Sequence, residues 1–169
     1  GSDGQLSGIV EIDETYIGGK QRGRGTGRGT AGKTVVIGMV ERGGRLRMVV
    51  APDTSSASLR NAAVKHVSKD VELIISDELN SYIPALGPIF TRRHKRIKHA
   101  NTYVDGNIHT NSIENTFSLL KRGIVGTWHK VSVKHLQKYL EEVAFRFSQR
   151  TNPLLFEETL SNLLGTDPL

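Results

Sequence analysis

Apolar and polar residues alternate along the first third of the chain. Residues 8–17 alternate well enough to predict a strand with Glu11 and Asp13 on one face. Residues 34–41 and 45–51 are rich in β-branched residues, and a short glycine-containing stretch of the hairpin type separates them. The pattern therefore predicts three strands in an antiparallel meander.

The remaining elements are mainly helical. Residues 55–68 are preceded by good N-cap residues, and residues 71–76 form a short apolar run typical of a strand buried in a parallel pairing. Further helices are predicted at 79–86 (stopped by Gly87-Pro88), 111–122 and 132–149, with a weak edge strand near 96–99. This order predicts an α/β fold, a mixed sheet flanked by helices, as in the ribonuclease-H-like fold.

One domain accounts for most of the 169 residues. We expect residues 1–7 to be a leader or a cloning remnant, residues 8–152 to be the domain, and residues 153–169 to be a tail with some helical character. Residues 18–33 hold seven glycines and five basic residues without an apolar face, so we expect a mobile loop inserted in the domain.

Composition and charge narrow the function. The chain has no cysteine, which excludes disulfides and thiolate zinc sites. Its formal charge is +6 and its isoelectric point about 9.7, which is typical either of a protein that meets a polyanion or of a well-solvated basic protein. The basic loop contains Lys20, Arg22, Arg24, Arg28 and Lys33. It either follows a DNA backbone or is a solvated extension of the hairpin.

Three acidic residues have positions that suit a metal site. Asp13 lies late on the first strand, Asp77 ends the buried strand, and Glu114 begins a helix. If these elements are neighbours, the three carboxylates converge, and divalent cations such as Mg²⁺ or Mn²⁺ would relieve their repulsion. Two ions about 4 Å apart activate a water or a 3′-hydroxyl and stabilise the leaving oxygen.

Each acid also has a simpler explanation. An Asp at a strand end is more often a turn or cap residue than a ligand. Residues 111–114 match a capping box, in which Glu114 would close the start of its helix. Glu11, Glu14 and Glu78 are neighbouring acids that are easily mistaken for ligands. Spacing alone leaves the triad open.

Several blocks of sequence resemble a known family. The strings EIDETYIGGK (11–20), SDE (76–78) and HTNSIENTFSLLKRG (109–123), together with GTWH (126–129), are similar to the signature blocks of bacterial DDE transposases of the ISXO type, whose eukaryotic relatives are the Merlin elements. The similarity runs in order from about residue 8 to residue 150. It implies a ribonuclease-H-like catalytic domain.

The resemblance also implies roles for individual residues. It places the three metal-binding acids at Asp13, Asp77 and Glu114, with Mg²⁺ or Mn²⁺ as the cofactor, as two ions. It places a phosphate-binding lysine at Lys121, on the same helix face as Glu114; without the resemblance, Lys121 would be an ordinary exposed lysine. Arg122 and the basic loop would contact DNA. His99, His109 and His129 lie near these blocks but lack the spacing of a zinc module.

The function implied is hydrolysis of a phosphodiester at a transposon end, followed by transfer of the freed 3′-hydroxyl to target DNA. The alternatives are a ribonuclease-H-like nuclease that only hydrolyses and a domesticated, non-catalytic DNA-binding domain. We expect DNA as the partner, a homodimer or higher oligomer on DNA, and a location with the bacterial nucleoid or in a eukaryotic nucleus. Such transposases usually carry an N-terminal zinc-ribbon or helix-turn-helix segment. These residues include none, so we do not expect them to recognise ends by themselves.

Overall fold

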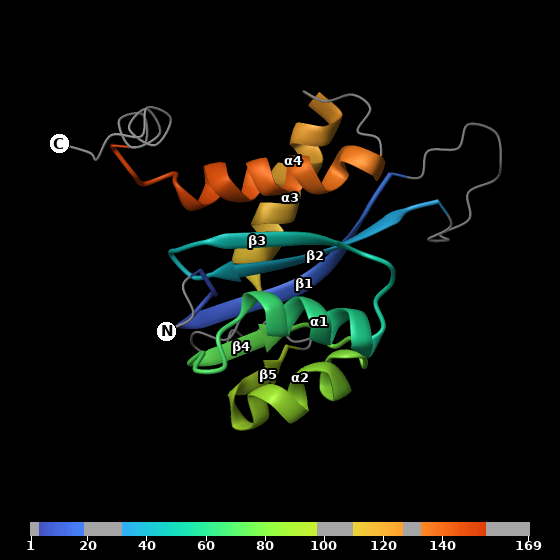
Figure 1. Ribbon diagram of the computed structural model, residues 1–169, viewed down its shortest axis with the longest axis vertical. Coiled ribbons are helices and arrows are strands. Elements are labelled where there is room, and N and C mark those ends of the chain that lie inside the picture. Colours follow the sequence, from blue (N-terminus) through green and yellow to red (C-terminus); the bar gives the residue numbers. More distant parts are fainter. Residues whose placement is uncertain (1–3, 19–31, 98–109, 127–132, 155–169) are drawn as a thin grey trace.

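A five-stranded mixed sheet forms the centre of the domain in the computed structural model, which describes residues 4–18, 32–97, 110–126 and 133–154 (Figure 1). The strand order is β3-β2-β1-β4-β5. The first three strands pair antiparallel, and β4 and β5 continue the sheet parallel to β1. The strands are β1 (Ile9–Ile17), β2 (Thr34–Glu41), β3 (Leu46–Ala51), β4 (Leu73–Ser76) and β5 (His94–Arg96). The predicted meander and the parallel pairing are both confirmed.

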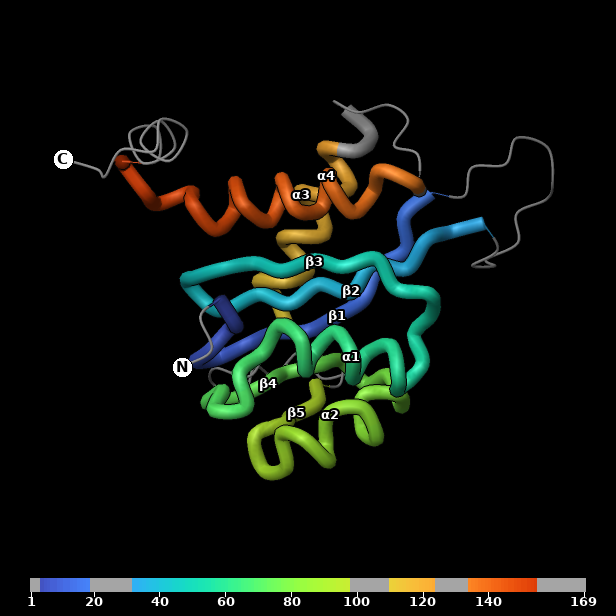
Figure 2. Tube along the Cα trace, in the orientation of Figure 1, coloured from blue at the N-terminus to red at the C-terminus, as the bar shows by residue number. Residues whose placement is uncertain are grey.

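Helices cover both faces of the sheet (Figures 1 and 2). They are α1 (Ser56–His66), α2 (Tyr82–Phe90), α3 (Asn111–Gly126) and α4 (Val133–Ser148), with a short 3₁₀ turn at Thr91–Arg93. The alternation of β2 divides the core between the faces. Val35, Ile37 and Met39 pack with α1 and α2, whereas Val36 and Val40 pack with α3 and α4. Because both faces of β1 are covered, the polar side chains of Glu11 and Thr15 are buried on it.

The sequence prediction for α2 was wrong at its carboxyl end. The helix continues through Gly87 and Pro88 to Phe90 instead of stopping at residue 86. Proline at position 88 removes the N–H that would bond to the Pro84 carbonyl. That carbonyl accepts a hydrogen bond from the Arg60 guanidinium of α1 instead, so the gap in the helix ladder leaves no unpaired acceptor.

The outer edge of β3 is closed by side chains of α4. Gln137 accepts a hydrogen bond from the Val50 N–H at 2.9 Å and donates one to the Met48 carbonyl at 3.2 Å. Ser148 accepts from the Leu46 N–H at 3.0 Å. The free N–H and carbonyl groups of an open edge strand can pair with another chain. On β3, these contacts with α4 satisfy such groups at Leu46, Met48 and Val50.

The sequence pattern places the start of the domain at residue 8, but the hydrophobic core begins before that residue. Leu6 is fully buried and forms a bridge with Val67, just after α1. The N-terminal cap of α1 is as predicted: Ser55 Oγ accepts from the Ser58 N–H.

Among the described helices, none is long and apolar enough to cross a membrane.

Candidate active site

Asp13, midway along β1, and Asp77, directly after β4, lie beside each other at the edge where the parallel strand β4 ends. β1 and β4 are parallel neighbours in which Glu11 is paired with Ile75, and extending this register by two residues places Asp13 opposite Asp77. The carboxyl ends of parallel strands are where α/β sheets place their active sites. The pairing of two acids at this edge, expected from the sequence, is therefore present.

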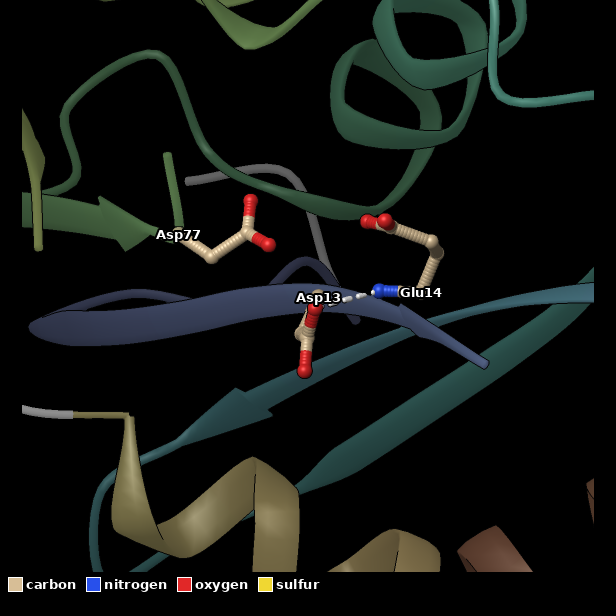
Figure 3. A group of neighbouring side chains, drawn as sticks. All are labelled: Asp13, Glu14 and Asp77. Atoms are coloured by element: carbon tan, nitrogen blue, oxygen red, sulfur yellow. Dashed lines mark hydrogen bonds between the residues drawn. The ribbon is translucent and has the colours of Figure 1, made fainter. Parts of the chain in front are cut away.

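Glu14 completes a group of three carboxylates with these two residues. One oxygen from each of Asp13, Glu14 and Asp77 lies within 4.8 Å of the others. Figure 3 shows Glu14 and Asp77 pointing towards each other on one side of β1, while the Asp13 side chain points to the other side. Glu14 is on the opposite face of β1 from Asp13, where Tyr82 Oη donates a hydrogen bond of 2.8 Å to it. Sequence reasoning had treated Glu14 only as a neighbouring acid.

The three carboxylates are electrostatically unfavourable together. Burial, followed by the charge of Glu14 and smaller contributions from Asp77 and Glu114, raises the pKa of Asp13 to about 7, although the Glu14 N–H bonds to Asp13 Oδ1. Burial also raises the pKa of Glu14, and the pKa of the Tyr82 hydroxyl is raised well above 10 by burial and by Glu14. Within the described parts of the chain, no lysine or arginine side chain pairs with these three acids.

Asp77 combines two roles that the sequence presented as alternatives. Its Oδ1 accepts a hydrogen bond of 2.9 Å from the Leu79 N–H, so it does organise the turn after β4. The same carboxylate also faces Asp13 and Glu14. A turn residue can therefore present an oxygen to the cluster, and the turn fixes its orientation.

Glu114 lies outside the group of three but near it. It is exposed in the first turn of α3, and its charge contributes to the raised pKa of Asp13. α3 begins at Asn111, so the residue before the helix is Thr110. The Thr110 hydroxyl donates to Glu114 Oε1 at 3.3 Å, and the Glu114 N–H donates to the Thr110 carbonyl at 3.1 Å.

The predicted DNA-binding residues are described only in part. Lys121 and Arg122 are exposed on α3, and Lys33 is exposed just before β2. Lys20, Arg22, Arg24 and Arg28 lie outside the described residues, as do His99, His109 and His129. The loop that holds the four basic residues starts and ends at the paired residues Ile17 and Thr34. They lie four residues beyond Asp13 and Gly38, about 13 Å along the hairpin.

Three further polar residues near the site had been given no role from the sequence. Glu11 is fully buried on β1, Tyr82 holds Glu14, and His94 Nε2 lies 2.9 Å from Ser76 Oγ beside Asp77. Burial and the charge of Arg96 lower the pKa of His94 to about 4, so its imidazole is neutral at pH 7. The signal for Glu11 was visible, since it shares a strand face with Asp13. Nothing in the spacing of Tyr82 or His94 pointed to the site.

Solved structures of integrase catalytic cores are similar to this chain. The catalytic core domain of BIV integrase has a TM-score of 0.54 and 11% identity to this chain, covering 82% of this chain and 81% of that one. The catalytic core domain of HTLV-2 integrase, in a complex with magnesium, has a TM-score of 0.47 and 12% identity, covering 84% of this chain and 85% of that one. The similarity to the first confirms the predicted ribonuclease-H-like fold.

A family match covers most of the chain. No curated protein matches significantly. The profile of the ISXO2-like transposase domain matches residues 5–148, a range that contains every acid described above and most of the secondary structure. The resemblance seen in the sequence blocks is thereby confirmed, and the chain belongs to the ISXO2-like transposase domain family, as the catalytic domain of a DDE transposase.

Proposed function

We propose that this domain cleaves a phosphodiester at a transposon end and then joins the freed 3′-hydroxyl to target DNA. The observation that supports the proposal most directly is the meeting of Asp13, midway along β1, with Asp77, directly after β4, next to Glu14 and near Glu114. Such a cluster costs stability unless a cation or protons compensate it. Its location fits a binding site for the reacting DNA strand.

The donor set fits a divalent metal. Carboxylate oxygens are the ligands that Mg²⁺ and Mn²⁺ prefer, and the described residues offer Asp13, Glu14 and Asp77 no basic side chain in place of a metal. We assign Asp13, Asp77 and Glu114 as the ligands of Mg²⁺ or Mn²⁺, bound as two ions, with Glu14 beside them. Bound there, the metal would activate the attacking oxygen and stabilise the leaving one.

Basic residues near the acids would hold the DNA. Lys121 lies seven residues after Glu114, on the same face of α3, and is exposed. We assign it to a phosphate of the strand being cut. Arg122, Lys33 and the residues of the 18–33 loop would contact the backbone more widely, which contributes affinity without sequence specificity. DNA is therefore the proposed partner.

We propose an oligomer, at least a homodimer, because a transposon has two ends. We also propose a cellular location with the bacterial nucleoid or in a nucleus.

Substitution of single acids tests the proposal. Asp13→Ala, Asp77→Ala and Glu114→Ala should each abolish Mg²⁺-dependent nicking of supercoiled plasmid DNA while the circular dichroism spectrum stays unchanged. Glu78→Gln is the matched control, because Glu78 is the exposed acid directly after Asp77, and it should nick normally. Near wild-type nicking by Glu114→Ala, together with a lower melting temperature, would show that Glu114 only stabilises the start of α3.

A parallel measurement separates Glu14 from Glu114. Glu14→Gln keeps an oxygen that accepts from Tyr82, but it removes the charge. If Glu114 is the third ligand, Glu14→Gln should retain part of the nicking activity that Glu114→Gln loses. The reverse order of the two variants would assign the third ligand position to Glu14.

A further inference from the structure

Glu11 is a fully buried acid that the proposed reaction does not use. Its side chain is 0% exposed and lies two residues before Asp13 on the same face of β1. Oε1 accepts a hydrogen bond of 2.7 Å from Arg42 Nε, and Oε2 accepts one of 3.0 Å from the Ile113 N–H. A buried carboxylate is costly to desolvate, and truncating it would leave its partners unsatisfied. Its two contacts, with Arg42 and with the first turn of α3, therefore indicate a structural role near the site.

The Ile113 N–H belongs to the first turn of α3. The first N–H groups of a helix have no partner within the helix, and a negative charge beside them is favourable. The residue before the helix usually provides this cap. Here the Thr110 hydroxyl instead donates to the carboxylate of Glu114. Glu11 supplies the accepting oxygen from another element, at the residue that directly precedes Glu114 along the chain.

A second contact fixes α3 against the same part of the sheet. Gly38 is the β2 residue paired with Asp13. A Cβ atom at Gly38 would lie 2.7 Å from Ile113 Cδ1 and 2.7 Å from the nearest atom of the Phe117 ring. The missing side chain thus lets α3 approach the sheet beside Asp13. Packing over Gly38 sets the height of the helix above the sheet, and the Glu11 bond fixes its first turn in place.

We infer that Glu11 is a positioning residue for the active site: its carboxylate, held by Arg42, joins the strand of Asp13 to the first turn of α3 and so sets the position of Glu114 relative to Asp13. This role rests on the proposed function, because it needs Glu114 as a ligand. Both acids are then oriented by one strand, Asp13 directly and Glu114 through Glu11. Arg42 holds the Glu11 carboxylate in place, with its second oxygen at the Ile113 N–H.

Mn²⁺ binding, measured by titration calorimetry, tests the inference without any need for activity. Glu11→Gln keeps the shape but turns one accepting oxygen into a donor, which must then face either Arg42 Nε or the Ile113 N–H. It should weaken Mn²⁺ affinity by about tenfold, as the loss of an outer contact to a metal site usually does. In a Glu114→Gln background, the same change should weaken affinity less than about twofold, because the residue that it positions is already lost.

A control separates positioning from general loosening. Gln137→Leu removes another side-chain oxygen that accepts from a backbone N–H, between α4 and β3. It should lower the melting temperature and leave Mn²⁺ affinity unchanged. If Glu11→Gln does not fold, Glu11→Gln/Arg42→Met removes the Arg42 guanidinium as well, and the same loss of affinity is expected.

The outcomes distinguish the positioning role of Glu11 from the proposed metal site. Wild-type Mn²⁺ affinity in folded Glu11→Gln, or in the double variant, would overturn the positioning role, as would equal losses in the presence and absence of the Glu114 carboxylate. A loss of affinity in Gln137→Leu that matches that of Glu11→Gln would overturn it too. Unchanged Mn²⁺ affinity in Asp13→Asn and Glu114→Gln would overturn the proposed metal site itself.

Discussion

Burial and neighbouring charge act together on Asp13. Its pKa is raised from 3.8 to about 7, mainly by burial and then by the charge of Glu14. A group whose pKa is higher in the folded state than in the unfolded state binds its proton more tightly when folded. The ionisation of Asp13 therefore has almost no effect on the free energy of unfolding below pH 3.8. It lowers that free energy increasingly as the pH rises towards about 7, and the loss is complete above that pH. The site thus carries an electrostatic cost at neutral pH.

Asp13→Asn should therefore stabilise the metal-free protein. We expect the melting temperature to rise by about 5 °C at pH 8, a shift that corresponds to roughly 2 kcal/mol in a domain of this size. The rise should be smaller at pH 5, where much of the cost is already removed by protonation. Differential scanning calorimetry at the two pH values measures it, with Glu78→Gln as the control. Equal shifts at both pH values, or a fall, would contradict the pKa direction.

Added metal should reduce or reverse the difference in melting temperature between the wild type and Asp13→Asn. Mg²⁺ at millimolar concentration stabilises a protein that binds it in the folded state. The wild-type melting temperature should rise with Mg²⁺, whereas that of Asp13→Asn should stay nearly constant. The same calorimeter run with and without the metal gives the answer. A rise of equal size in both proteins would place the metal elsewhere.

At the scale of elements, the docking of α3 on the sheet controls the site. Gly38 leaves the space that Ile113 and Phe117 fill, and both of these side chains are buried. Gly38→Ala should cost about 1–3 kcal/mol, because the added methyl overpacks the core. It should also reduce nicking, since α3 carries Glu114 and would be pushed away from Asp13. Chemical denaturation and the plasmid assay measure the two effects.

Another glycine provides the matched control for that substitution. Gly87 lies within α2, and a Cβ added there would meet nothing within 4 Å. Gly87→Ala should change the stability by less than about 1 kcal/mol, because the helix preference of alanine is offset by the crowding of its Cβ against the ring of Pro88. In Gly38→Ala/Ile113→Val, one of the contacted atoms is absent, so part of the lost stability should return. An unchanged deficit in that double variant would show that the clash over Gly38 is not the cause.

Strands and long helices could be predicted from the sequence because their patterns are local. Alternation placed β1, β2 and β3 to within a residue, and the apolar spacing of α4 matches its buried face. The end of α2 was missed because Pro88 is tolerated through Arg60, a residue of another helix. The contact of Glu11 with α3 was missed for the same kind of reason, because its partner Ile113 is 102 residues away. The proximity of Asp13 and Asp77 could be expected, since both belong to strand segments that are visible in a sequence.

At the scale of the whole molecule, basic residues are distributed around the sheet. The hairpin of β1 and β2 extends beyond Asp13 and leads into the 18–33 loop. Changing Arg22, Arg24 and Arg28 together to Gln should weaken DNA binding equally for unrelated sequences. The slope of log affinity against log salt should fall by about 2–3, since each lost phosphate contact removes roughly 0.9. Fluorescence anisotropy at several salt concentrations measures both.

Three basic residues remote from the acids control for the loss of charge. Lys65, Lys69 and Arg92 are exposed and lie at the amino-terminal side of β4 and β5, the opposite edge from Asp77. Changing these three to Gln removes the same charge and should change the salt slope by less than about 1. An equal effect of the two triple variants would mean that net charge, and not the loop, determines DNA binding.

The last prediction separates a transposase from a nuclease and depends on what surrounds the acids. A site that activates an oxygen at a metal accepts either water or a 3′-hydroxyl. A nuclease needs room for one DNA, whereas a transposase holds a cut end and admits a second duplex. Exposed basic residues lie on two elements that border the site: Lys33 just before β2, and Lys121 and Arg122 on α3. That arrangement suits two DNA segments better than one.

We therefore expect pre-cut DNA with a free 3′-hydroxyl to be joined to a target strand in the presence of Mg²⁺ or Mn²⁺. The joined product is longer than either substrate and is read on a denaturing gel. A 3′-dideoxy end should give no product, because the attacking oxygen is absent, while nicking of separate plasmid DNA continues. Lys121→Ala should reduce joining and cleavage together, since both reactions need the phosphate held beside the acids. Robust cleavage at the transposon's own ends, with no joined product under either metal, would establish a nuclease.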